Sequence, residues 1–324
     1  TGTGTPVSPV SVIPNGVTPN VGDLWSLNSK LDNLCEVGEA TDATVKYSGT
    51  NIIVVADNNN PAGGFTDVQY HNLGATVDSF YSTIITTLGT PSDKDGNGKI
   101  VIFMTAGVNR LSPPASSVVT MAMYSPRDAL TQSECPTSNL GEIIYVLAPD
   151  PTGSVNSNVR TVSSVEGGAP PQIAHELAQI VIDSRRLAAG YGFEESWLNE
   201  ALAAIAQEKV FFLRATLNPL QNIVVTNLTT GPNASVRVAA FNTYINNYFG
   251  YYRPWLQAPT RLGAFDYSGN EMASRGLGWA FLRYVGDRYS NSSLAVEGAM
   301  YRNLVDSPYT GNTNLENLIN DDAN

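Results

Sequence analysis

Residues 173–186 read IAHELAQIVIDSRR, and residues 197–200 read WLNE after a short loop that contains two glycines. Apolar residues recur through 173–186 at helical spacing, which predicts an amphipathic helix. The proline pair that starts at Pro170 suits the first turn of that helix. Ser196 is a suitable N-cap and predicts a second helix over 197–212. The C-terminal half of the chain is therefore predicted to be mainly helical.

The preceding half has the patterns of strands and one long helix. A β-rich run at 45–57 contains a Ser-Gly turn signal and predicts either a strand pair or one long bent strand. Apolar residues at helical spacing predict a helix over 73–88, with glycine and proline as stop signals. The runs KIVIFMT at 99–105 and EIIYVLA at 142–148 are typical of buried strands. Strands first and helices later is the pattern of an α+β fold.

These patterns divide the chain into three parts. Residues 1–22 are rich in Thr, Pro, Gly and Asn, which predicts a linker or a processed N-terminal segment. We expect a mixed-sheet subdomain over 23–186 that ends in the helix with HELAQ, and a helical subdomain over 187–324. Within the latter, residues 215–270 are predicted to be irregular, and 277–288 predict a further helix.

Composition limits the location and the partners. The 324 residues include 18 basic and 29 acidic side chains, for a net charge of −11. This balance argues against nucleic acid or an anionic membrane as main partner, because basic surface is lacking. No apolar run approaches the roughly 20 residues of a membrane-spanning helix. The low charged fraction predicts a secreted or cell-surface protein, extracellular or periplasmic.

Two cysteines, Cys35 and Cys135, lie far apart in the sequence and outside any metal-binding spacing. An even count in a chain of secreted composition predicts one disulfide that closes a long loop. The alternative is two buried free thiols.

The segment HELAQ places three chemically useful side chains on one helix. His175 and Gln179 are four residues apart and so share a face, with Glu176 beside them. In the motif HExxH, two histidines bind zinc and the glutamate acts as general base on the metal-bound water. Glu200 lies in the next helix, where a third ligand would come from. Here a glutamine stands in place of the second histidine.

The order of HExxH-like segment, short loop and WLNE helix resembles the hyicolysin-type neutral zinc metallopeptidases, a thermolysin-like gluzincin family. The resemblance covers roughly residues 65 to 305 and includes DKDGNGKI at 93–100 and GLGWAFLRY at 276–284. It implies a thermolysin-like zincin fold. It also implies zinc ligands at His175, Gln179 and Glu200, with Glu176 as the catalytic base.

The chain departs from that family at two positions. Gln179 replaces the second histidine, and its amide oxygen is a harder and weaker zinc donor than an imidazole, so the zinc site is expected to be weak. Arg275 stands where an aromatic residue is expected. It is a candidate for the group that stabilises the transition state.

A second metal site is suggested by the segment DKDGNG. Asp93, Asp95 and Asn97 place oxygen atoms at alternate positions with a glycine sixth, as in the first half of a calcium loop. Together with the carbonyl of Lys99 they are predicted calcium ligands. The alternative is a turn without an ion that leads into the next strand.

The leading hypothesis is a secreted zinc endopeptidase that hydrolyses peptide bonds in a peptide or protein substrate by metal-activated water. Glu176 would activate the water and pass its proton to the leaving amine. The alternative is a catalytically inactive pseudopeptidase, a peptide-binding or cell-surface structural protein in which Gln179 bonds Glu200 or Glu176.

Overall fold

The computed structural model of the chain describes residues 13–32, 35–36, 38–117, 119–260 and 271–321. Residues 1–12 of the predicted linker lie outside this range. Contacts divide the chain into two units. The sheet unit comprises Thr1–Ser79 and Asp93–Glu176, and the helical unit comprises Phe80–Ser92 and Leu177–Asn324. We had placed the division after residue 186, at the end of the predicted helix.

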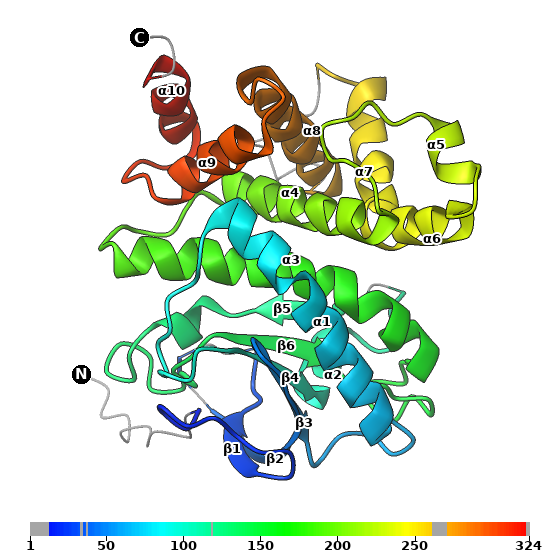
Figure 1. Ribbon diagram of the computed structural model, residues 1–324. Coiled ribbons are helices and arrows are strands. Elements are labelled where there is room, and N and C mark those ends of the chain that lie inside the picture. The colour runs from blue at the N-terminus through cyan, green and yellow to red at the C-terminus, as the bar shows by residue number, and fades with distance from the viewer. Residues whose placement is uncertain (1–12, 33–34, 37, 118, 261–270, 322–324) are drawn as a thin grey trace. The chain divides into compact units, whose positions relative to one another are not determined.

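The sheet unit contains one mixed sheet (Figure 1). Its strand order is β1-β2-β3-β4-β6-β5. β3 is parallel to β4, and β4 to β6, whereas the pairs β1–β2, β2–β3 and β5–β6 are antiparallel. The strands are β1 (Leu24–Asn28), β2 (Ala40–Ser48), β3 (Ile52–Asp57), β4 (Ile100–Thr105), β5 (Ala122–Tyr124) and β6 (Ile143–Leu147). This confirms the mixed α+β class.

The centre of the sheet follows from the apolar runs of the sequence. Every residue of β3, β4 and β6 is buried. Such runs are typical of central parallel strands that are covered on both faces. Short helices follow β4 and β5, namely α2 (Ala106–Leu111) and the 3-10 helix η1 (Pro126–Ala129). The predicted strand pair at 45–57 is the hairpin of β2 and β3.

Helix α1 (Asp67–Leu88) packs its first half on β2. Asp78 accepts hydrogen bonds from the Tyr47 hydroxyl and the Asn51 amide, both at 2.8 Å. Gly74 lies against the Tyr47 ring, where a Cβ atom would clash. His71 is exposed and its ring contacts the edge of Tyr47. The glycine thus permits the close approach of helix and strand.

Helix α3 (Val162–Ala188) starts earlier than we predicted. The helix was expected to begin at the prolines, but Pro170 and Pro171 lie inside it. Proline removes a helical hydrogen bond and disfavours helix at the preceding residue. Burial offsets this cost, because Val165 and Ala169 in the first turns are fully buried.

The helical unit is built around α4 (Ser196–Ala215), which packs against α6 and α8. Gly276 of α8 lies so close to the α7 backbone that a Cβ atom would clash with it. The other helices are α5 (Val225–Thr229), α6 (Ala234–Tyr244), α7 (Asn246–Gln257), α8 (Glu271–Tyr289), α9 (Leu294–Val305) and α10 (Gly311–Asp321). The predicted helices at 197–212 and 277–288 correspond to α4 and α8.

The prediction of an irregular segment at 215–270 was wrong where the structure describes it. Helices α5, α6 and α7 lie there. Their Asn- and Tyr-rich sequence has low helix propensity, but tertiary contacts compensate. Gln207 of α4 donates to the Tyr244 carbonyl at 2.8 Å and accepts from the Tyr248 hydroxyl at 3.1 Å. Residues 261–270 lie outside the described range.

Two further predictions concern the chain as a whole. Cys35 and Cys135 form the predicted disulfide, with a sequence separation of 100 residues. Among the described residues, no helix has the length and apolar character needed to cross a membrane.

Candidate functional site

Helix α3 carries the residues of the HELAQ segment. His175 and Glu176 are 5% and 9% exposed, and Gln179 is half-buried. His175 and Glu176 belong to the sheet unit, whereas Gln179 belongs to the helical unit. The predicted base is therefore a mostly dehydrated carboxylate.

The Glu176 carboxylate lies at the free edge of the sheet. Its Oε2 atom accepts a hydrogen bond of 2.8 Å from the backbone amide of Tyr124 in β5. β5 is an edge strand, and Leu147 of β6 donates to the Met121 carbonyl. In an antiparallel pair, the backbone N–H and C=O groups of successive residues point alternately toward and away from the partner strand. Because Met121 faces β6, the backbone groups of Ala122 and Tyr124 point away from it. Glu176 thus contacts the row of backbone groups that another extended chain could pair with.

In the helical unit, three predicted site residues form a connected group. Gln179 Nε2 donates to Glu200 Oε1 at 3.2 Å. Glu200 Oε2 accepts from Arg275 Nη1 at 2.7 Å. Arg275 also pairs with Glu271 one turn earlier in α8, at 2.7 Å. The amide orientation of Gln179 follows from chemistry, because an amide oxygen facing the carboxylate would be repelled.

The loop between α3 and α4, which places Glu200, is fixed by a buried ion pair. Arg186 and Glu194 have no exposed side-chain surface and pair at 3.3 Å. Arg186 also donates to the carbonyls of Gly192, Ser307 and Tyr309. The position of Glu200 therefore depends on residues near the end of the described chain.

A buried aspartate links α3 directly to the WLNE segment. Asp183 Oδ1 accepts from Asn199 Nδ2 at 3.0 Å. Burial raises the pKa of Asp183 to about 7, and the Asn199 hydrogen bond and the nearby Arg186 only partly offset that shift. Sequence analysis missed this contact. Its signal was an acidic residue within the apolar pattern of α3.

The donor atoms of the helical unit fit zinc poorly. Both Glu200 oxygens accept hydrogen bonds, one of them from a guanidinium cation. Gln179 presents its amide nitrogen to Glu200, and its amide oxygen is a harder and weaker zinc donor than an imidazole. A zinc ion that used Glu200 as a ligand would compete with Arg275 for the same oxygen.

A second group of acidic residues lies in the sheet unit. Ligand atoms of Asp93, Asp95 and Glu142 lie within 4.8 Å of one another, close enough to hold a metal ion. Among the described residues, no other group of three His, Cys, Asp or Glu side chains meets this criterion. Burial, reinforced by the negative charges of Glu142 and Asp93, raises the pKa of Asp95 to about 7. These three carboxylates are a candidate cation site.

The structure groups the predicted calcium residues differently from our expectation. Asn97 donates its side-chain amide to Asp95 at 2.8 Å, and its Oδ1 accepts from the Lys99 amide at 2.7 Å. Its side chain thus closes the turn. Glu142 was missed. It immediately precedes β6, and the DKDGNG turn precedes β4, which is the parallel neighbour of β6. Only the strand order reveals that the starts of β4 and β6 lie side by side.

Comparison with known proteins adds no assignment. No family model matches the chain, and no curated protein is significantly similar to it. The class that the structure defines is thus a mixed α+β protein with a single mixed sheet, and the resemblance to zinc metallopeptidases stays a prediction.

Proposed function

We propose that this is an extracellular, zinc-peptidase-like protein that binds extended peptides and does not hydrolyse them. One observation carries the proposal. Glu200, the residue in the third zinc-ligand position, has both carboxylate oxygens in hydrogen bonds to Gln179 and Arg275. The side chain that would bind the metal is used for an ion pair instead.

The charge on Arg275 supports the loss of metal. A guanidinium at 2.7 Å from the carboxylate supplies the positive charge that zinc would otherwise bring. Arginine stays protonated at all physiological pH values, so this competition is permanent. The amide of Gln179 also lacks the affinity of an imidazole for zinc. Arg275 and Gln179 thus both lower the zinc affinity of the site.

The position of β5 at the edge of the sheet supports peptide binding, and Ala122 and Tyr124 at this edge are 7% and 8% exposed. An extended peptide can add to an exposed sheet edge through backbone hydrogen bonds, which gives affinity for many sequences. Ala122 directs its amide away from β6, because of the register in which β5 and β6 pair. The neighbouring Tyr124 amide is bonded to Glu176. A peptide at this edge would therefore pass Glu176.

Metal-dependent hydrolysis is the second candidate, and one observation favours it. Glu176 is 9% exposed and is held at the sheet edge by a backbone amide. This environment suits a general base next to a bound peptide. His175, directly before it, retains the first ligand position of the motif.

One set of variants distinguishes the two candidates. Elemental mass spectrometry and casein cleavage are measured for the unchelated wild type, for Glu176→Gln, and for the double variant Gln179→His, Arg275→Met. We expect the wild type to contain no stoichiometric zinc and to leave casein intact. The double variant restores HExxH and removes the competing cation, so it should gain zinc. Near-stoichiometric zinc in the wild type, with cleavage that Glu176→Gln abolishes, would establish the hydrolase instead.

Peptide binding is tested separately at β5. Ala122→Pro removes the outward amide without removing a bond to β6, whereas Ala122→Ser keeps that amide. Isothermal titration with unfolded, reduced casein peptides should show binding to the wild type and to Ala122→Ser, and at least about tenfold weaker binding to Ala122→Pro. Equal affinities for all three proteins would exclude the β5 edge as the peptide site.

The proposal also includes a bound ion and a cellular location. Calcium is the proposed ion for Asp93, Asp95 and Glu142, because clustered carboxylate oxygens suit hard divalent cations. A secreted or cell-surface location is proposed from the disulfide, since such bonds persist in oxidising compartments.

A further inference from the structure

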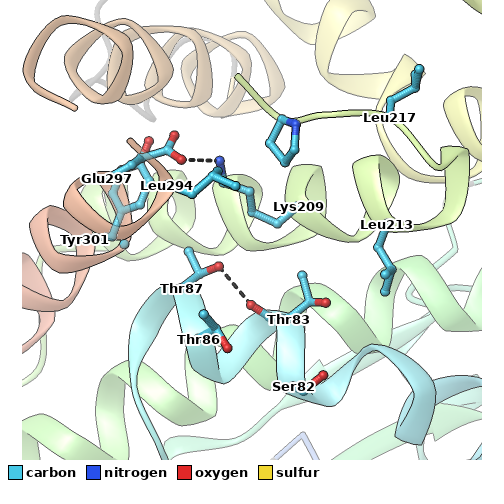
Figure 2. Close-up of a pocket in the computed structure, with 12 residues that line it drawn as sticks. Ser82, Thr83, Thr86, Thr87, Lys209, Leu213, Leu217, Leu294, Glu297 and Tyr301 are labelled. Carbon is cyan, nitrogen blue, oxygen red and sulfur yellow. Dashed lines mark hydrogen bonds and ion pairs between the residues drawn. The ribbon is translucent and has the colours of Figure 1, made fainter. Parts of the chain in front are cut away.

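The helical unit contains two cavities apart from the HELAQ segment. The smaller has a volume of about 390 Å³ and lies among α1, α4 and α9 (Figure 2). The larger has a volume of about 700 Å³ and is lined by residues of α4 to α8 and the connecting loops. Either is large enough for a small organic molecule.

The smaller cavity offers little for recognition. Its cation, Lys209, is paired with Glu297 at 2.6 Å, as Figure 2 shows. The Thr87 hydroxyl donates to the Thr83 carbonyl within α1. The ammonium group of Lys209 and this hydroxyl are therefore already satisfied by the protein itself.

The larger cavity has a continuous aromatic wall. Four rings from four helices contact one another in sequence, with centroid separations of 6.1, 5.6 and 5.1 Å. They are Phe211, Phe241, Phe249 and Trp279, and all four line the cavity. Phe249 is 50% exposed although it faces this wall, so apolar surface remains uncovered. Rings in this arrangement suit a flat apolar ligand.

One end of the same cavity is polar and contains an incompletely bonded arginine. Arg283 pairs with Asp287 and Glu297 through Nη2. Its Nε and Nη1 atoms are buried and have no hydrogen-bond partner among the described residues, and the Glu208 oxygen lies 3.7 Å from Nη1. Buried donors without an acceptor are costly. They have almost no accessible surface, so a ligand in the cavity would not reach them, and Arg283 contributes charge rather than a hydrogen bond.

We propose that this cavity binds an uncharged ligand with a flat aromatic body, which packs on the aromatic wall. The carboxylates of Glu208 and Asp287 also line the cavity. An anionic ligand would meet their repulsion, whereas a neutral ligand would not. The proposal is independent of the function proposed for the HELAQ segment.

Nile red is a suitable probe, because it is neutral, flat and aromatic, and becomes fluorescent in apolar surroundings. We expect saturable binding at one site of the wild type. Leu228→Trp fills the larger cavity and should weaken binding by at least about tenfold. Leu213→Trp makes the same change in the smaller cavity and should leave the affinity within about twofold. Circular dichroism establishes that both variants are folded.

The charge preference is tested with anilinonaphthalene sulfonate, an anionic aromatic probe. The wild type should bind it at least about tenfold more weakly than Nile red. Asp287→Asn removes one negative charge at an exposed position. It should reduce the difference in affinity between the two probes, because the anionic probe is repelled less strongly. Absence of saturable Nile red binding, equal effects of the two tryptophan variants, or equal affinity for both probes would overturn the proposal.

Discussion

The two units of the molecule bury charged groups in different ways. In the sheet unit, Asp128 is fully buried and accepts hydrogen bonds from the Asn139 amide and the Tyr145 hydroxyl, both at 2.7 Å. Its neighbour Arg127 donates to the backbone carbonyls of Asn28 and Lys30. Arg127 and Asp128 also form a buried ion pair at 3.5 Å, and neutral groups of the fold supply their other contacts.

Around the two cavities of the helical unit, buried charged side chains meet mostly one another. Lys209 pairs with Glu297, and Arg283 contacts Glu297 and Glu208. These residues line two cavities, and donors of Arg283 remain without an acceptor among the described residues. Removing one member of such a cluster leaves the remaining buried charges less well compensated and destabilises the fold. The comparison teaches that backbone and neutral side chains supply most contacts of the buried pair in the sheet unit, whereas the cavity charges of the helical unit rely on one another and should be more sensitive to substitution.

The largest expected loss of stability comes from removing the disulfide of the sheet unit. Replacing both Cys35 and Cys135 by serine removes a crosslink that closes a loop of 100 residues. The chain-entropy relation predicts a loss of about 4.7 kcal/mol for a loop of this size. Urea unfolding followed by circular dichroism measures it. A loss below about 1 kcal/mol would mean that the sheet is sufficient without the disulfide.

The next effect tests the ion pairs of the helical unit. Lys209→Met removes one partner from buried Glu297 and should cost about 3 to 5 kcal/mol. The control is Lys46→Met, which breaks an exposed pair with Asp67 in the sheet unit and should cost about 1 kcal/mol or less. Both are measured by urea unfolding. Equal losses would remove the contrast between the two units.

A pH series tests a single buried carboxyl of the helical unit. Asp183 has a pKa of about 7 in the folded protein, above its ordinary value. Such a group contributes full stability below its unfolded pKa, and the contribution is lost as pH rises through the folded pKa. As pH rises from 4 to 7, ionisation of Asp183 should therefore lower the free energy of unfolding by up to about 4 kcal/mol.

The variant Asp183→Asn resembles the protonated form and should lack this part of the pH dependence. Thermal unfolding at about pH 4 and at about pH 7.5 compares it with the wild type, because these values span most of the range over which the carboxyl titrates. Parallel pH profiles of the two proteins would show that Asp183 does not titrate in this way.

The smallest expected effect concerns ion binding in the sheet unit. Calcium at about 100 times its dissociation constant should stabilise the protein by about 2.7 kcal/mol. Glu142→Gln should abolish this gain. Glu134→Gln, which changes an exposed carboxylate outside the triad, should leave it intact. Loss of the gain in both variants, or in neither, would contradict a site at the triad.

Sequence patterns predicted those features that depend on local periodicity. The apolar runs at β4 and β6 and the helical spacing of α1, α4 and α8 match the structure, because burial of these segments requires those patterns. The disulfide also follows from composition. Helices α6 and α7 could not be found in this way, since contacts with residues such as Gln207 stabilise them.

The candidate site was less accessible to sequence reasoning than the fold. His175, Glu176, Gln179 and Glu200 were predicted from the HELAQ spacing and from the resemblance to zinc metallopeptidases, but the pairing of Glu200 with Arg275 joins α4 to α8 and needs the tertiary structure. Glu142 likewise became a site residue only when β4 and β6 proved to be neighbours. Residues that meet across strands or helices leave no signal in local spacing.

The disulfide has a consequence for how the chain can be cut. Cys35 and Cys135 enclose Phe80–Ser92, a segment that belongs to the helical unit although both cysteines belong to the sheet unit. The covalent ring therefore passes through both units. A single protease cut inside this ring adds one water molecule to the mass and leaves the two fragments joined by the disulfide. The fragments therefore separate on a gel only after a reducing agent is added.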